Sequence, residues 1–227
     1  MSQDTDSYSA EARARSEALA LDPTRPLILC DADEVLLDFA RPLARFLDRR
    51  GYMLDLKSFA LAGNIRRKSD NTEIDGPEIR RLIADYFDTE IDTAAPVDGA
   101  VAAIGELGQR AQVIVVTNVP HHLRARRESA LAAAGLKLPV VSNSGAKGPL
   151  IRQLAARHGG QVAFIDDLPP HHTSVADHAS DVHRIHFVAN PELGRLLDKA
   201  PDAHVRIDRW TDCRAYLIDH FGTTAAC

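Results

Sequence analysis

The chain has 227 residues, of which 45% are hydrophobic and 26% are charged, and its net charge is −5 at pH 7. These values are ordinary for a globular protein, and the acidic balance gives no support for a nucleic-acid partner. No apolar stretch approaches the roughly 20 residues that span a bilayer, so we expect no membrane partner. The cysteines lack metal-ligand spacing, which favours a reducing, cytoplasmic location: Cys30, Cys213 and Cys227.

The first strand is expected at residues 27–30. Residues 1–20 form a polar extension without an apolar signal core, and the proline-containing segment 22–26 leads into the run Leu-Ile-Leu-Cys. A continuously apolar run is typical of a buried strand in a parallel sheet. Asp31 and Asp33 follow directly, so we expect both at the carboxyl end of this strand, where open α/β sheets bind their ligands. Cys30 is expected to be a small core residue.

Residues 40–95 have a different pattern. Apolar residues recur at helical spacing over 39–47, and a second amphipathic helix is expected to begin at Pro77. The segment between them, 58–75, is polar and basic with little periodicity. We therefore predict a helical insertion without strands, in which two apolar stripes pack mainly on each other.

This insertion is expected to form a lid hinged near residues 38–42 and 89–96, whose closure would exclude water from the reaction. Its basic run Arg66-Arg67-Lys68 supplies the first candidates for contacts with an anionic substrate. A charge run is more often a solvated face, which is the competing interpretation.

From Pro96 onward, strand and helix patterns alternate. Strands are expected near 113–116, 138–141, 162–165 and 183–188, with helices between them and a closing helix near 209–221. Repeated units of this kind indicate a parallel sheet with right-handed crossovers. We predict an α/β protein with a Rossmann-like core of residues 1–39 and 96–227, including the extension 1–20, and a small α-helical cap of residues 40–95.

Polar side chains follow several of the expected strands. Thr117 and Asn118 follow the second strand, a loop supplies Lys147, and Asp166-Asp167 follow a later strand. Because the carboxyl ends of parallel strands share one edge, these groups should converge with Asp31 and Asp33. Packed carboxylates repel one another and require a cation, and an all-oxygen ligand set favours Mg²⁺. Since Mg²⁺ binds phosphate oxygens, the expected partner is a small phosphorylated substrate.

The sequence resembles the haloacid dehalogenase-like hydrolase superfamily over residues 27–188. Four motifs in the family's order carry the resemblance: Asp31-Ala32-Asp33-Glu34-Val35, Val116-Thr117-Asn118, Lys147 within Gly-Ala-Lys-Gly-Pro-Leu, and Phe164-Ile165-Asp166-Asp167. The family usually has Gly where this chain has Glu34. The insertion between the first two motifs resembles the family's small helical cap, which implies a Rossmann-like catalytic core below it.

The resemblance implies a Mg²⁺-dependent phosphatase that hydrolyses a small phosphorylated metabolite through an aspartyl-phosphate. Asp31 would be the nucleophile, and Asp33 would protonate the leaving oxygen and then activate water. Mg²⁺ would be held by Asp31, by the backbone carbonyl of Asp33, by Asp167 directly, and by Asp166 directly or through water.

The same resemblance implies the phosphate contacts. Thr117 and Lys147 would hold phosphoryl oxygens, and Lys147 would also offset the carboxylate charge. Asn118 would donate to the same group from its side chain or backbone. The pairs His121-His122 and His171-His172 each follow a motif by a few residues and are candidates for the mouth of the site.

Three alternatives remain open at this point. A phosphosugar mutase of the same fold would be a phosphoryl transferase, and a non-catalytic module would bind a phospho-ligand without turnover. A haloalkanoate dehalogenase would use the same nucleophile on carbon, but Asp33 and the acidic pair Asp166-Asp167 argue against it.

Overall fold

The computed structural model describes residues 8–58 and 60–224. Within them, six parallel strands form one sheet in the order β5-β4-β1-β6-β7-β8, flanked by helices. The strands are β1 (Leu27–Cys30), β4 (Gln112–Thr117), β5 (Val140–Ser142), β6 (Val162–Asp166), β7 (His183–Phe187) and β8 (Val205–Ile207). The parallel α/β fold expected from the sequence is confirmed. The edge strand β8 was not expected, because three residues carry too short a pattern to recognise.

Two layers of helices cover the sheet. On one face lie α1 (Ala10–Glu17), α6 (Gly148–His158) and α7 (Pro169–His178), and on the other lie α4 (Ala100–Leu107), α5 (Arg124–Ala133) and α9 (Trp210–Thr224). Two short helices complete the core, η1 (His121–Leu123) and α8 (Pro191–Leu196). Every residue of β1 is fully buried, since the strand lies between β4 and β6 and is covered on both faces. In the described part of the chain, no helix has the length and apolar character needed to cross a bilayer.

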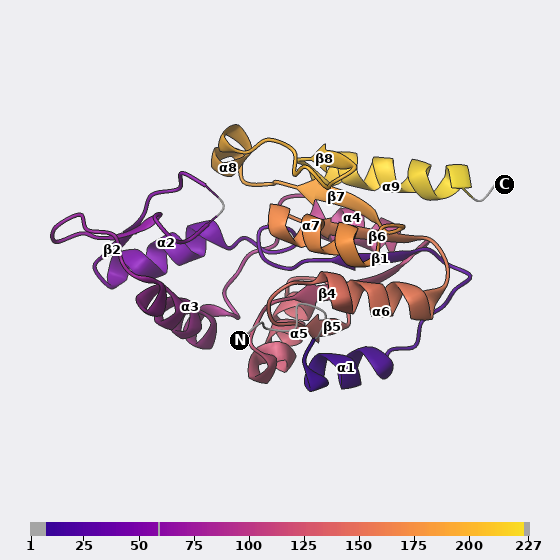
Figure 1. Cartoon of the computed structure of the whole chain (residues 1–227), viewed down its shortest axis with the longest axis horizontal. Coiled ribbons are helices and arrows are strands. Elements are labelled where there is room, and N and C mark those ends of the chain that lie inside the picture. Colours follow the sequence, from indigo (N-terminus) through magenta and orange to yellow (C-terminus); the bar gives the residue numbers. More distant parts are fainter. Residues whose placement is uncertain (1–7, 59, 225–227) are drawn as a thin grey trace.

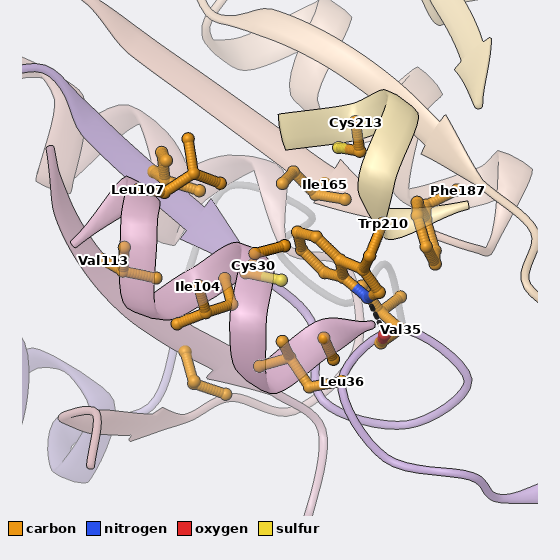
Figure 2. Packing of buried hydrophobic residues seen from close by; sticks show 14 of the residues in the cluster. Cys30, Val35, Leu36, Ile104, Leu107, Val113, Ile165, Phe187, Trp210 and Cys213 are labelled. Atoms are coloured by element: carbon orange, nitrogen blue, oxygen red, sulfur yellow. Dashed lines mark hydrogen bonds between the residues drawn. The ribbon is translucent and has the colours of Figure 1, made fainter. Parts of the chain in front are cut away.

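The first residue of α9 fixes the loop that follows β1. The indole Nε1 of Trp210 donates to the carbonyl of Val35 at 2.8 Å, and the ring packs beside Phe187 (Figure 2). Cys30 and Cys213 lie buried in the same cluster, so the expectation that Cys30 is a core residue is confirmed. A buried indole needs a partner for its N–H, and here that partner is the backbone of the loop that carries Asp31 and Asp33.

The insertion lies to one side of the parallel sheet (Figure 1). It contains α2 (Ala40–Arg49) and α3 (Gly76–Glu90), as expected, but also β2 (Tyr52–Leu54) and β3 (Ile65–Arg67), which pair antiparallel. The prediction of an insertion without strands was therefore wrong. Each strand has only three residues, too few for an alternating pattern to stand out from a polar segment. The two helical stripes do pack on each other, in a cluster that includes Phe46, Leu82 and Tyr86.

The two chain connections between core and insertion lie side by side. The backbone N–H of Asp38 donates to the carbonyl of Ala95 at 2.8 Å, and that of Val97 donates to the carbonyl of Leu36 at 2.9 Å. This pairing places both crossing points next to the loop that follows β1. The hinges near residues 38–42 and 89–96 stay a prediction.

Gly148 allows the turn that carries Lys147 to approach α7 closely. A Cβ at this position would lie 2.1 Å from the carbonyl oxygen of Ser174, and the Gly148 N–H already donates to Ser174 Oγ at 3.0 Å. Because the nearest atom is backbone, it cannot move aside cheaply. The close contact therefore fixes where α6 begins, and with it the position of Lys147.

We predict that Gly148→Ala lowers the free energy of unfolding by about 1–3 kcal/mol, the usual range for forced overpacking. Urea unfolding followed by circular dichroism would measure the change. Gly105→Ala in α4 is the matched control, because a Cβ there would meet no described heavy atom within 4 Å and alanine favours a helix. Equal stability of Gly148→Ala and wild type would contradict the role of this contact.

Candidate active site

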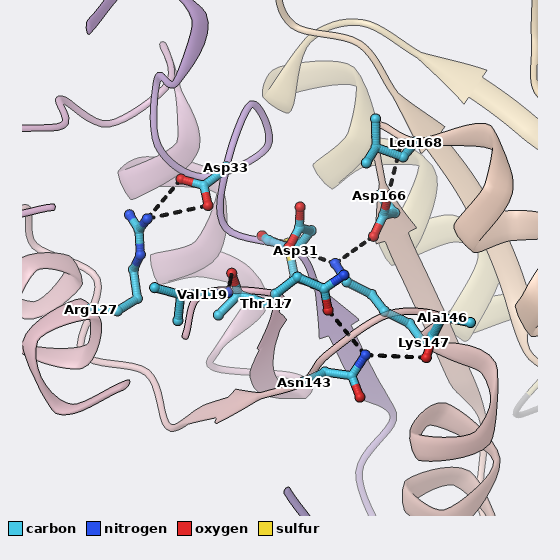
Figure 3. A network of polar contacts seen from close by, with 12 residues as sticks. Asp31, Asp33, Thr117, Val119, Arg127, Asn143, Ala146, Lys147, Asp166 and Leu168 are labelled. Carbon is cyan, nitrogen blue, oxygen red and sulfur yellow. Dashed lines mark hydrogen bonds and ion pairs between the residues drawn. The ribbon is translucent and has the colours of Figure 1, made fainter. Parts of the chain in front are cut away.

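Lys147 lies at the centre of the site. Its Nζ lies 2.6 Å from Asp31 Oδ1 and 2.7 Å from Asp166 Oδ2, and its side chain is 1% exposed (Figure 3). Asp31 follows β1, Asp166 ends β6, and Lys147 precedes α6. The carboxyl edge of the sheet thus brings together three residues that are far apart in the chain, as the motif spacing predicted.

Asp31, Asp166 and Asp167 form an acidic cluster. One carboxylate oxygen from each lies within 4.8 Å of the others, and in the described part of the chain these are the residues placed to hold a metal ion. The donors are all oxygen, which fits a hard cation such as Mg²⁺. The side chain of Asp33 lies outside this group, consistent with the expectation that only its backbone carbonyl would be a ligand.

The electrostatics of the cluster show that Lys147 alone does not neutralise it. Burial raises the pKa of Asp31 to about 7, although Lys147 favours its ionised form. Burial and the neighbouring Asp166 raise the pKa of Asp167 well above its usual value. Burial also disfavours the charged form of Asp166, but Lys147 together with His171 and His172 outweighs this and lowers its pKa. All three carboxylates can therefore be ionised together near neutral pH only with a further cation.

Thr117 and Asn118 sit at the end of β4. Thr117 is 1% exposed and faces the site cavity, as a phosphate contact would require. The Asn118 side chain instead connects two loops, because its Nδ2 donates to the Gly145 carbonyl at 2.9 Å and its Oδ1 accepts from Asn143 at 3.0 Å. Its amide is therefore engaged in holding the loop before Lys147, which leaves the backbone of Asn118 as the candidate for a phosphate contact.

Glu34 adopts a left-handed backbone conformation, which favours glycine. Its φ is +59°, in the left-handed region, which costs a non-glycine residue about 1–2 kcal/mol. Its carboxylate accepts from the backbone N–H groups of Phe39 at 2.9 Å and Ala40 at 2.5 Å, at the start of α2. These two bonds cap the first helix of the insertion and offset the strained backbone. The loop thus holds a left-handed turn at this position without a glycine.

Arg127 is a site residue that the sequence did not reveal. It lies on α5 with 1% of its side chain exposed, and its Nη2 lies 2.9 and 3.2 Å from the two carboxylate oxygens of Asp33 (Figure 3). Its Nε and Nη1 have no hydrogen-bond partner among the described residues, and its guanidinium lies 5.7 Å from the ring centre of Phe87 in α3. Within an Arg-rich helix, nothing in the sequence distinguished Arg127 from its neighbours. In this conformation, the carboxylate expected to act as acid and base is held against a cation.

The histidine pairs differ in their surroundings. His171 lines the cavity, and burial lowers its pKa to about 4, so the ring is neutral at physiological pH. His172 Nε2 lies 3.0 Å from the backbone carbonyl of Asp166, where it fixes the end of β6. His121 contacts Ser9 and His122 contacts Asp88, and neither lines the cavity. Only His171 thus matches the expectation of a histidine at the site mouth.

A cavity of about 310 Å³ opens above the acidic cluster, between the core and the insertion. Asp31, Lys147 and Thr117 line its floor, and residues from α2, α3 and the segment around β2 line the opposite wall. The basic run of the insertion does not reach it, because Arg66 pairs with Glu73, Arg67 with Glu78 and Lys68 with Asp48: these six residues are absent from the cavity lining. The expectation that this run contacts substrate is not met in this conformation.

No protein-family model and no curated protein sequence matches the chain. Solved structures do share its fold. A haloacid dehalogenase-like protein of unknown function from Agrobacterium tumefaciens superimposes with a TM-score of 0.62 at 17% identity, covering 88% of this chain and 99% of that one. A HAD-family hydrolase from Deinococcus radiodurans, with bound phosphate and sodium, gives 0.58 at 14% identity, with coverage of 87% and 97%. A putative beta-phosphoglucomutase from Thermotoga maritima gives 0.56 at 12% identity, with coverage of 86% and 99%.

The chain therefore has the fold of the haloacid dehalogenase-like hydrolases, which confirms the fold that the resemblance implied.

We predict that the Asp33–Arg127 pair responds asymmetrically to substitution. Asp33→Ala leaves a buried guanidinium without an anion, which typically costs about 3–5 kcal/mol. Arg127→Met leaves a carboxylate that is 19% exposed and can be hydrated, so it should destabilise less. Chemical denaturation of both variants and of the double variant would form a mutant cycle. A larger loss for Arg127→Met than for Asp33→Ala would contradict this interpretation.

Proposed function

We propose that the protein is a Mg²⁺-dependent phosphomonoester hydrolase that acts on a small phosphorylated metabolite through an aspartyl-phosphate intermediate. The observation that carries the proposal is the position of Lys147, 2.6 Å from Asp31 and 2.7 Å from Asp166 at the floor of the cavity. The Lys147 ammonium can orient one carboxylate oxygen of Asp31 while the other carboxylate oxygen is presented to the substrate. The same cation would bind an oxygen of the transferred phosphoryl group.

The residues divide the chemistry among them. The Asp31 carboxylate would attack phosphorus, and the phosphoryl oxygens would be held by the Thr117 hydroxyl, the Asn118 backbone and Lys147. Asp31, Asp166, Asp167 and the backbone carbonyl of Asp33 would hold Mg²⁺, which when bound supplies positive charge to the carboxylates and to the phosphoryl oxygens.

Asp33 would protonate the leaving oxygen and then take a proton from the attacking water. To do this, its carboxylate must leave Arg127, with which it is paired in this structure. Arg127 also contacts Phe87 of the insertion, so movement of the insertion and release of Asp33 involve the same side chain.

A phosphosugar mutase is the second candidate, since one structural neighbour is named a putative beta-phosphoglucomutase. Conversion of a sugar 1-phosphate to the 6-phosphate without net phosphate release would favour it. Binding of phosphate esters without any turnover would favour a non-catalytic module.

Substitution of the nucleophile tests the proposed mechanism. Asp31→Asn removes the anion but keeps the size of the side chain, so phosphate release should fall by several orders of magnitude. Because burial raises the pKa of Asp31, the neutral amide should be tolerated and the melting temperature should not fall sharply. Asp177→Asn, at an exposed position on α7, is the matched control and should keep full activity. Near-wild-type turnover by Asp31→Asn would reject the aspartyl-phosphate route.

Metal dependence gives a second test. Chelator should abolish phosphate release and Mg²⁺ should restore it, whereas Ca²⁺ should substitute poorly because its coordination is larger and looser. Mg²⁺ should also raise the melting temperature of the wild type by relieving repulsion in the acidic cluster, and should raise that of Asp167→Asn less. Full activity in chelator would contradict the proposed role of the metal.

A further inference from the structure

The wall of the cavity opposite the acidic cluster is apolar. It is formed by side chains from α2, the segment around β2, α3 and the region of α8: Leu43, Leu54, Leu56, Leu61, Ile83 and Leu193, together with others of the same kind. Several of them are only half buried, including Leu54, Leu56 and Ile83. Partly exposed aliphatic side chains that face a cavity gain free energy when an apolar group covers them.

Charged groups are confined to the floor of the cavity. Among the described residues that line it, Lys147 is the one Lys or Arg, and it already contacts Asp31 and Asp166. The remaining charged lining residues are all acidic. A substrate with a second anionic group, such as a carboxylate, would be desolvated against this wall without a cation to pair with.

The two arginines of the adjoining cavity do not change this conclusion. An adjoining cavity of about 590 Å³ is lined by Arg41 and Arg209. Arg41 lies 2.6 Å from Asp38, and Arg209 lies 2.8 Å from Asp212, so each already has a carboxylate partner.

Hydrogen-bonding groups are also scarce away from the floor. Asn190 lines the cavity, but its Oδ1 accepts from the backbone N–H groups of Glu192 and Leu193 and so caps α8. The hydroxyl oxygen of Ser58, which also lines the cavity, already accepts from the backbone N–H of Ala60 at 3.3 Å. A sugar presents several hydroxyl groups that each need a partner when buried, and this wall offers few.

We propose that the leaving group of the substrate is a small, uncharged, apolar alcohol, so that the enzyme acts on alkyl or aryl phosphates rather than on phosphosugars or phosphorylated acids. The inference rests on the proposed phosphatase function and names its substrate class. The cavity volume of about 310 Å³ lies at the lower end of the range for small-molecule sites, roughly 300–1,000 Å³, so the alcohol is small.

Binding of alkylphosphonates tests the substrate class without requiring turnover. In these compounds phosphorus is bonded directly to carbon, so they present the phosphoryl oxygens but have no ester bond to hydrolyse. Calorimetry in the presence of Mg²⁺, with chains from ethyl to hexyl, should show affinity rising by about fourfold per methylene, the value expected for a fully buried CH₂ group, until the cavity is filled. Affinity independent of chain length, or tighter binding of a phosphonate that carries a carboxylate, would overturn the inference.

Two variants locate the effect on the wall. Ile83→Asn should weaken hexylphosphonate more than ethylphosphonate, whereas Leu196→Asn should change neither, because Leu196 is 51% exposed and does not line the cavity. If the asparagine side chain impairs folding, Ile83→Ala is the second variant. It should also reduce the gain in affinity per added methylene. Equal losses on both ligands for the Ile83 variants would overturn the assignment of the wall.

Phosphate release then separates the inference from the function on which it rests. The ratio kcat/KM should be higher for butyl and hexyl phosphate than for glucose 6-phosphate or a phosphorylated hydroxy acid. Faster release from the sugar or acid phosphates would overturn the substrate class and leave the phosphatase intact. If phosphonate affinity rises with chain length but no ester releases phosphate, the apolar site is supported and the phosphatase function is rejected.

Discussion

The contact of one buried ammonium with two buried carboxylates is the constraint on which the rest of the site depends. Lys147 Nζ lies within 2.7 Å of both Asp31 and Asp166, and none of the three side chains is more than 9% exposed. A buried carboxylate without a cation would be protonated or would open the structure to water. The fold therefore has to place the lysine that precedes α6 at the ends of β1 and β6, and the close approach of Gly148 to Ser174 fixes the start of α6 there.

The loop after β1 must meet two further demands at once. It has to present Asp31 and Asp33 to the cavity, and it has to start the insertion that covers them. The Trp210 indole holds the loop at Val35 from the core side, and the Glu34 carboxylate caps α2 on the insertion side. A glycine at position 34 would relieve the backbone strain but would lose the cap. In this chain a strained turn is therefore combined with a direct link between the loop after β1 and the insertion.

Much of this arrangement could be predicted from the sequence, because the site residues come directly after the expected strands. A buried strand that runs into Asp31 and another that runs into Asp166 both end at the same edge of a parallel sheet, so their convergence needs no knowledge of packing. The acidic pair and Lys147 were located for the same reason. Their roles in catalysis remain predictions, since position alone does not establish chemistry.

The features that the sequence did not reveal depend on tertiary packing. Arg127 is one of several arginines in α5, and only the packed structure shows that it is buried against Asp33. The strands β2 and β3 are three residues each, and their pairing is non-local. The basic run in the insertion was predicted as a candidate substrate contact, but in the structure it forms ion pairs with Glu73, Glu78 and Asp48. Charge partners of this kind are set by the fold and leave no periodic signal.

The proposed mechanism requires that Asp31 becomes phosphorylated during turnover. Rapid quenching during turnover of an alkyl phosphate, followed by borohydride reduction of acyl phosphates and peptide mass spectrometry, measures this directly. We expect conversion of Asp31 to homoserine in the presence of Mg²⁺ and none in chelator. Steady phosphate release while Asp31 stays unmodified, or reduction of another carboxylate in its place, would contradict this mechanism.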